Sequence, residues 1–198
     1  MKFSKFFSYL ALMLLLVLLV LVLASWMLSA TRGEDVRSLL SSEGIRFFLG
    51  GFVSMMQHPL LVWLLLLSMA WGCLSASGML SFFSTPLAAH RRRQTVILLT
   101  ILFLVYLGVV LWLTVPSQAV LLSATGQLWP SPFSRALVPI VSFGTILLSA
   151  VYGLLARRFL SVADVFQALV HGIAAAAPLL LLYVLVMQLV GSLRFIFG

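Results

Sequence analysis

The chain has 198 residues, of which 63% are hydrophobic and 8% charged, and its mean hydropathy is +1.22. Soluble domains use about 45–50% apolar and about 25% charged residues, so this composition excludes a soluble protein and indicates an integral membrane protein. The net charge of +8 does not indicate nucleic-acid binding, because the basic residues stand in small clusters between apolar runs and no basic face carries aromatic residues.

A helix needs about 20 residues to cross the hydrocarbon core, so a chain of this length holds about five spans in a single membrane domain over residues 1–198. The first apolar run, residues 6–30, follows Lys2 and Lys5. The apolar part of a secretory signal peptide has about 7–15 residues. This run is longer, so we expect an anchor helix that is not cleaved.

Residues 31–59 hold three of the four acidic residues and are too polar for a span. Ser41 or Ser42 suits the cap of a helix that begins near Glu43, whose charge is favourable at the positive end of the helix dipole. The apolar residues that follow are interrupted by polar ones. We therefore expect one short helix over about residues 42–57 that lies in the membrane interface.

Four more apolar runs of spanning length follow the short helix. Ser161 and Asp164 have the Ser-x-x-acid spacing of a helix start, and they precede the last run, which Pro178 is expected to kink. The chain is thus expected to be all-α, with five membrane spans and one interfacial helix. The expected spans are residues 6–30, 60–80, 95–115, 136–156 and 168–190.

The positions of the basic residues predict the orientation of the spans. An N-terminus in the cytoplasm and a C-terminus outside place seven of the twelve basic residues inside. Basic residues at span ends favour the cytoplasmic side and contact lipid headgroups. The expected location is the inner membrane of a bacterium, crossed several times. The inside residues are Lys2, Lys5, Arg91, Arg92, Arg93, Arg157 and Arg158.

Small residues recur every fourth position in three of the expected spans. Such spacing allows two helix backbones to approach closely, so these residues are expected to pack helices of this chain or of a partner. A solute path along the same faces is the alternative. The helix-packing candidates are Ser68, Gly72, Ala76, Ser149, Gly153, Gly172 and Ala176.

Polar groups within the last span are few. His171 and Asp164 are seven residues apart, about 10 Å along a helix, which is too far for a hydrogen bond, so Asp164 is expected to cap the helix rather than serve a proton relay. Gln188 is expected to bind another helix. If the protein has a solute pathway, His171, Pro178 and Gln188 are its candidate residues.

No motif indicates an enzyme. The sequence has no nucleophile paired with a base, no spacing of metal ligands and no phosphate-binding glycine loop, so we expect no catalytic residue, metal or cofactor. Cys73 is the single cysteine and gives no intramolecular disulfide.

Two stretches resemble the AbgT family, the p-aminobenzoyl-glutamate transporters. Residues 39–49, which begin Leu-Leu-Ser-Ser-Glu-Gly, are similar to the segment after the family's first helix. A longer stretch resembles the loop and helix before the family's second re-entrant hairpin. It comprises residues 129–133 (Trp-Pro-Ser-Pro-Phe), 138–140 (Val-Pro-Ile), 152–154 (Tyr-Gly-Leu), 156–158 (Ala-Arg-Arg) and 163–164 (Ala-Asp).

The resemblance implies a dimeric, sodium- or proton-coupled exporter of folate-related aminobenzoyl compounds and sulfonamides, with a site between two hairpins. Only about ten residues separate Leu80 from Arg91, where the first hairpin would lie, and the second would lie beyond Gly198. We expect a shortened relative without either hairpin, and no family site residue has a counterpart here.

The leading hypothesis is a scaffold or accessory subunit that does not transport. Its expected partners are membrane lipids and other integral membrane proteins or a second copy of itself, with no nucleic acid. The alternative is a minimal oligomeric transporter of p-aminobenzoyl-glutamate-like compounds. A third hypothesis, a headgroup-binding protein, would depend on Arg91, Arg92 and Arg93.

Overall fold

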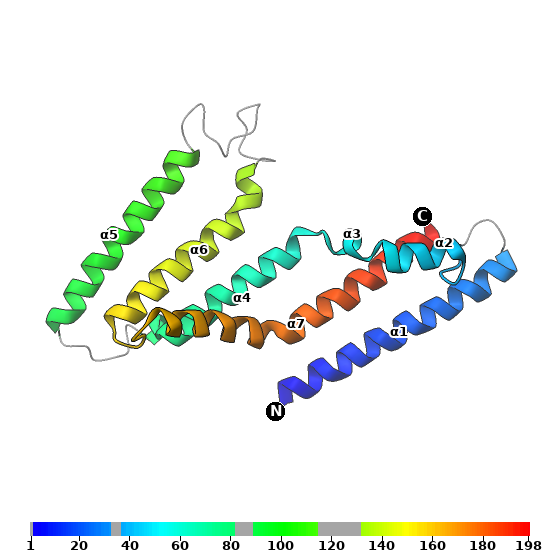
Figure 1. Ribbon diagram of the computed structural model, residues 1–198, viewed down its shortest axis with the longest axis horizontal. Coiled ribbons are helices and arrows are strands. Elements are labelled where there is room, and N and C mark those ends of the chain that lie inside the picture. Colours follow the sequence, from blue (N-terminus) through cyan, green and yellow to red (C-terminus); the bar gives the residue numbers. More distant parts are fainter. Residues whose placement is uncertain (1, 33–36, 82–88, 115–131) are drawn as a thin grey trace. The chain divides into compact units, whose positions relative to one another are not determined.

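The computed structural model describes residues 2–32, 37–81, 89–114 and 132–198, and every regular element within these ranges is helical (Figure 1). Five of the helices are long and apolar enough to cross a membrane. The chain is therefore an all-α integral membrane protein, as its composition indicated. The five helices are α1 (Lys2–Arg32), α4 (Pro59–Ser77), α5 (Ala89–Thr114), α6 (Pro132–Leu155) and α7 (Val162–Phe197).

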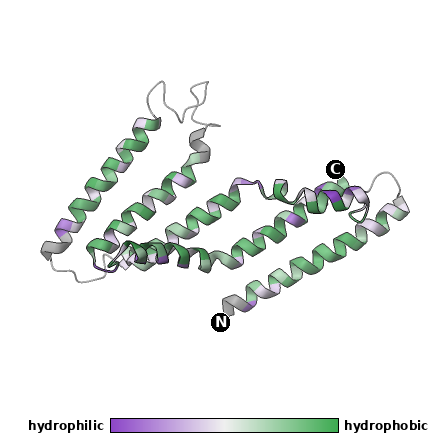
Figure 2. Ribbon diagram, in the orientation of Figure 1, coloured by the Kyte–Doolittle hydropathy of each residue, from purple (hydrophilic) through white to green (hydrophobic). Residues whose placement is uncertain are grey.

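Apolar residues predominate along the length of these helices (Figure 2). The most apolar windows of α1 and α5 have no buried residue, and the side chains of Leu12 and Trp112 are 59% and 73% exposed. A helix with so much exposed apolar surface is stable only if hydrocarbon or another protein surrounds it. The exposed apolar surface of α1 and α5 is therefore what a membrane environment requires, in agreement with the hydropathy of the sequence.

The segment after α1 is not the single regular helix expected at residues 42–57. It consists of α2 (Ser42–Ile45), a π-helical turn over Arg46–Gly50 and α3 (Phe52–Met56). The break falls at Gly50 and Gly51, and glycine weakens a helix interior because it gains the most freedom on unfolding. The location of this segment in a membrane interface stays a prediction.

The start of α2 explains the Leu-Leu-Ser-Ser-Glu-Gly stretch. Ser41 is the cap, and its hydroxyl accepts a hydrogen bond of 3.0 Å from the N–H of Gly44. A Cβ on Gly44 would lie 2.6 Å from the Cα of Leu39, so only glycine fits. The N–H of buried Leu39 in turn donates to the hydroxyl of Ser25 in α1, at 3.1 Å.

Helix α7 is longer than the span expected at residues 168–190. Its 36 residues measure about 54 Å at 1.5 Å per residue, against about 30 Å of hydrocarbon. The carboxylate of Asp164 accepts hydrogen bonds from the N–H groups of Leu160 (2.7 Å) and Ser161 (3.0 Å), which confirms that Asp164 caps the helix start. The helix continues through Pro178, which has no N–H to donate to the preceding turn.

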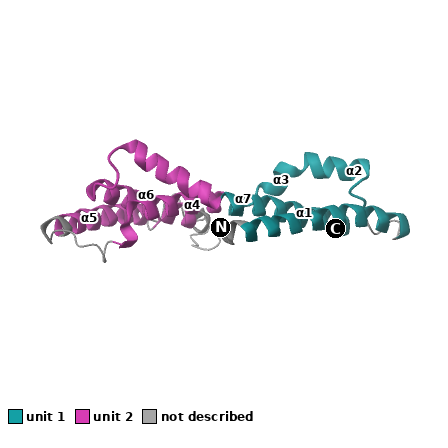
Figure 3. Cartoon of the chain, turned by 90° about the horizontal axis from the view of Figure 1, so that it is seen from below, with its two compact units in different colours: residues 1–61, 177–198 teal, residues 62–176 magenta. Residues whose placement is uncertain are grey.

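The chain forms two compact units, where the sequence indicated one membrane domain (Figure 3). Unit 1 comprises residues 1–61 and 177–198, and unit 2 comprises residues 62–176. Helix α7 contributes to both units, and the division falls beside Pro178.

Unit 1 joins the C-terminal part of α7 to α1 and to the segment that follows α1. Leu39, Phe195 and Ile196 form a buried cluster, against which Leu21 and Val22 of α1 pack. The N–H of Arg37 donates to the carbonyl of Ile196 at 3.3 Å. The segment after α1 and the end of α7 therefore lie at one level, as an odd number of crossings requires. The cytoplasmic position of the N-terminus is not tested by this contact and stays a prediction.

Unit 2 is held by contacts of α4 and α5 with α6 and of α4 with α7. The hydroxyl of Tyr106 in α5 donates to the carbonyl of Ile140 in α6 at 2.6 Å, and the Tyr106 ring lies against Gly144. The Cys73 sulfur in α4 lies 3.8 Å from the carbonyl of Ile146. Cys73 also belongs to a buried cluster with Phe159 and Ala168.

The turn from α6 to α7 has a defined hydrogen-bond pattern. The N–H of Arg157 donates to the carbonyl of Leu154 (3.1 Å), and that of Arg158 to the carbonyl of Gly153 (2.8 Å). This is a Schellman motif, whose penultimate position is left-handed and usually glycine. Arg157 occupies that position with φ of 55°.

We predict that Arg157→Gly stabilises the protein, because a side chain at left-handed φ costs about 1 kcal/mol. Thermal unfolding in detergent measures the change. Arg157→Ala is the matched control, since it removes the same charge but keeps a Cβ. If the glycine variant melts no higher than the alanine variant, the left-handed conformation is not a source of strain.

Candidate functional site

The closest contact between spans in unit 2 joins α4 to α7. A Cβ on Gly72 would lie 2.6 Å from the Cα of Gly172, and a Cβ on Gly172 would meet the carbonyl oxygen of Ser68. Neither position has room for a side chain, so the two helix backbones touch. Close approach of this kind is the usual way in which small residues associate helices in a membrane.

The remaining small residues have different surroundings. Ala176 is buried, whereas Ala76 is exposed. Ser149 is fully buried beside Cys73. Gly153 makes room for the ring of Phe159, which follows in the turn after α6, because a Cβ there would collide with that ring.

Most buried hydroxyl groups in the described spans bond to their own helix. Ser68 donates to the carbonyl of Leu65 (2.7 Å), Ser77 to that of Leu74 (3.0 Å) and Ser149 to that of Thr145 (2.6 Å). Ser25 and Thr114 do the same in α1 and α5. These hydroxyls are satisfied without a ligand and present no row of free polar groups to a solute.

Three buried polar side chains are exceptions. Gln188 is 4% exposed, and neither its amide nitrogen nor its amide oxygen has a hydrogen-bond partner in the described part of the chain. Ser192, one turn further along α7, and Ser142 in α6 are also buried without a partner. The sequence drew attention to Gln188 only, since a serine in an apolar span normally bonds to its own helix.

The other candidate pathway residues belong to different units. His171 is exposed and belongs to unit 2, whereas Pro178 and Gln188 belong to unit 1. The carboxylate of Asp164 is occupied by two backbone N–H groups, and no hydrogen bond joins it to His171. The described residues contain no group of three His, Cys, Asp or Glu side chains that would hold a metal.

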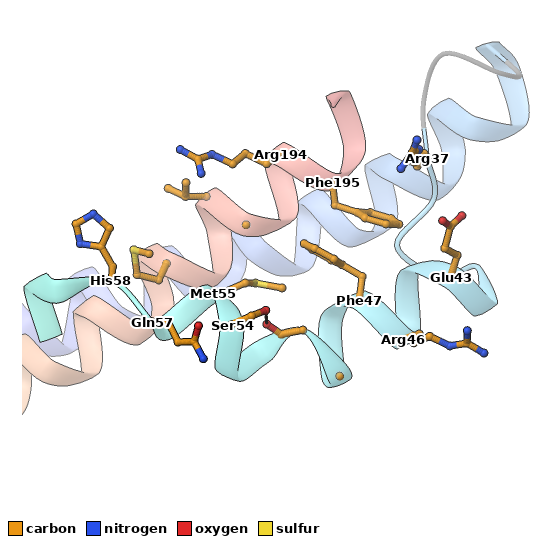
Figure 4. A pocket seen from close by; sticks show the side chains of 15 residues that line it. Arg37, Glu43, Arg46, Phe47, Ser54, Met55, Gln57, His58, Arg194 and Phe195 are labelled. Atoms are coloured by element: carbon orange, nitrogen blue, oxygen red, sulfur yellow. Dashed lines mark hydrogen bonds between the residues drawn. The ribbon is translucent and has the colours of Figure 1, made fainter.

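A cleft of about 970 Å³ lies in unit 1 between α7 and the segment after α1 (Figure 4). Its apolar residues come from both sides, and the rings of Phe47 and Phe195 are stacked with centroids 4.5 Å apart. Arg37, Arg46 and Arg194 line it together with a single acid, Glu43. The sequence did not reveal this cleft, because its residues lie up to about 160 positions apart.

The expected headgroup residues lie in unit 2. Arg91 and Arg92 belong to α5, but their side chains lie outside the described part of the structure, and Arg93 is exposed. Arg157 lines a second cleft of about 600 Å³ with residues of α5. The guanidinium group of Arg158 lies over Gly78, where a Cβ would be 2.8 Å from its central carbon.

The model of the AbgT putative transporter family matches residues 83–195. The matched range contains residues 129–164 of the resemblance and does not reach residues 39–49. No curated protein and no solved structure matches the chain.

We predict that Gly172→Ala destabilises the protein by about 1–3 kcal/mol, because the added methyl group would force the backbones of α4 and α7 apart. Thermal unfolding in detergent measures the loss. Gly108→Ala in α5 is the control, since nothing lies within 4 Å of a Cβ there. That control is expected to be neutral or to stabilise the helix by up to about 1 kcal/mol. Equal melting temperatures for the two variants would contradict the close contact.

Proposed function

Because the chain belongs to the AbgT putative transporter family, we propose that it is a transporter-like scaffold subunit of a membrane complex. In this role its spans pack against a second copy or against other proteins of a bacterial inner membrane. The subunit itself moves no solute.

The observation that carries this proposal is the state of the buried hydroxyl groups in the spans. Those of Ser25, Ser68, Ser77, Thr114 and Ser149 donate to carbonyls of their own helices. A transporter needs polar side chains or broken helices near the bilayer midplane to replace the water around its solute. Hydroxyls that bond to their own helix are less available for that task.

The connection between α4 and α5 also favours a scaffold. Residues 82–88 are all that stands between the turn that ends at Ser81 and the start of α5. The resemblance implies a re-entrant hairpin at this place, and seven residues are too few to enter a membrane and return.

Two exposed small residues offer places for a partner helix. Nothing lies within 4 Å of a Cβ on Gly108 in α5, and Ala76 in α4 is exposed. Small residues on a lipid-facing surface leave notches into which a second helix can fit.

The test is purification in a mild detergent, followed by native mass spectrometry. We predict a stable homo-oligomer or stoichiometric partners for the wild type. Gly108→Leu is expected to reduce the assembled fraction several-fold, because its side chain fills the notch from a Cβ that has nothing within 4 Å. Val109→Leu enlarges a neighbouring exposed residue and serves as the control. A wild-type protein that is a lone monomer would refute the scaffold function.

Gln188 favours a second candidate function, a minimal oligomeric transporter of p-aminobenzoyl-glutamate-like compounds. A buried amide without a partner costs about 1–3 kcal/mol, and a bound solute would satisfy it. In this case Gln188 would line a pathway that several copies complete.

If Gln188 binds a solute, we predict that Gln188→Leu abolishes flux of p-aminobenzoyl-glutamate into vesicles under a sodium or proton gradient. Ser149→Ala is the matched control, since its hydroxyl is already satisfied within α6. Absence of wild-type flux above empty vesicles would remove this function. A higher melting temperature for Gln188→Leu would then show that the amide is an unpaired polar group.

A further inference from the structure

The cleft of unit 1 combines an apolar floor with basic residues from three separate segments (Figure 4). Arg37 follows α1, Arg46 begins the π-helical turn, and Arg194 lies near the end of α7. None of the three guanidinium groups has an ion-pair partner among the described residues. Their positive charges are therefore not paired with an acid in the described part of unit 1.

The floor of the cleft is apolar and comes from both of its walls. Phe47 and Met55 belong to the segment after α1, and Met187, Val190 and Phe195 belong to α7. The Met55 side chain lies against Gly191, with its Cγ 3.1 Å from a Cβ built there, so the two walls touch beneath the cleft. The guanidinium carbon of Arg37 is 6.0 Å from the centre of the Phe195 ring, which ties one charge to the edge of the floor.

The cleft lies at the level where two spans end. The hydrogen bond from the N–H of Arg37 to the carbonyl of Ile196 joins the segment after α1 to the last turn of α7. Helices α1 and α7 are both long and apolar enough to cross a membrane. The ends of crossing helices lie in the headgroup region, where phosphate groups stand above acyl chains.

The geometry points to this cleft as a binding site for an anionic phospholipid. The phosphate group binds to guanidinium groups on the rim, and the first part of an acyl chain lies on the apolar floor. The arginines stand apart around the cleft rather than at one point (Figure 4). One headgroup therefore contacts one or two of them, and the remaining arginine contacts neighbouring lipid headgroups. Basic residues at span ends commonly fix topology alone, but here they share a cleft with apolar residues.

A label inside the cleft tests the assignment. Ser54→Cys in a Cys73→Ala background places a fluorophore on a lining residue, because Cys73 is the single cysteine. The protein is reconstituted in phosphatidylcholine vesicles that contain one tenth phosphatidylglycerol, with bromine on the acyl chains of either lipid. Quenching by brominated phosphatidylglycerol above its share of the bilayer measures enrichment at the cleft.

We predict enrichment of phosphatidylglycerol beside the wild-type cleft and its loss in Arg46→Gln/Arg194→Gln. Each basic residue near an anionic surface contributes about a fivefold preference, so removing two charges weakens the preference by roughly 25-fold. Quenching by the anionic lipid then falls to its share of the bilayer. Arg46→Lys/Arg194→Lys keeps the charges and most of the enrichment. Arg93→Gln/Arg157→Gln removes equal charge from unit 2 and leaves quenching at the cleft unchanged.

Three results would overturn the assignment. Quenching by the anionic lipid in proportion to its bulk share would show that the cleft does not select it. Equal loss in the unit 2 control would show a general effect of net charge. Removal of the enrichment by millimolar inorganic phosphate would show that the cleft takes a free anion instead. The readout does not depend on assembly or flux, so its failure is distinct from failure of the scaffold function.

Discussion

Contact between the backbones of α4 and α7 is the constraint on which unit 2 depends. Gly72 and Gly172 leave no space for a side chain between the two helices. In hydrocarbon, apolar surface gains little by burial against another helix, so association depends on close packing. The same approach brings Cys73 and Ala168 into the buried cluster that receives Phe159 from the turn after α6. A glycine pair thus determines where the following turn can pack.

The membrane also explains how polar groups are distributed. Most of the buried serines and threonines in the described spans donate to carbonyls of their own helices, which satisfies them in a medium without water. Charged side chains stand at helix ends, and Asp164 bonds to the backbone before α7 rather than to a side chain within the span. Ser142, Ser192 and Gln188 depart from this pattern. Both the nitrogen and the oxygen of the buried Gln188 amide lack a partner among the described residues, so a further partner would stabilise this side chain.

The five spans followed from hydropathy, and the helix caps followed from short-range spacing. Ser41 before α2 and Asp164 after Ser161 are local features, and the structure places both as spacing indicates. The division of the short helix into α2, a π-helical turn and α3 did not follow, because it depends on Gly51 lying against the carbonyl of Phe47. Small-residue spacing identified Gly72 and Gly172, which do touch. The same spacing also included Ala76, which is exposed, and Gly153, which lies against the ring of Phe159.

The sequence by itself determined the class of protein, the number of spans and the family resemblance, because each depends on composition or on residues close together in the chain. The tertiary structure decided which glycines touch, which polar groups lack partners and where basic residues meet. Along the sequence, three separate charges stand near span ends: Arg37, Arg46 and Arg194. They share one cleft only because the end of α7 bonds to the segment after α1, a contact between positions about 160 residues apart that no local pattern encodes.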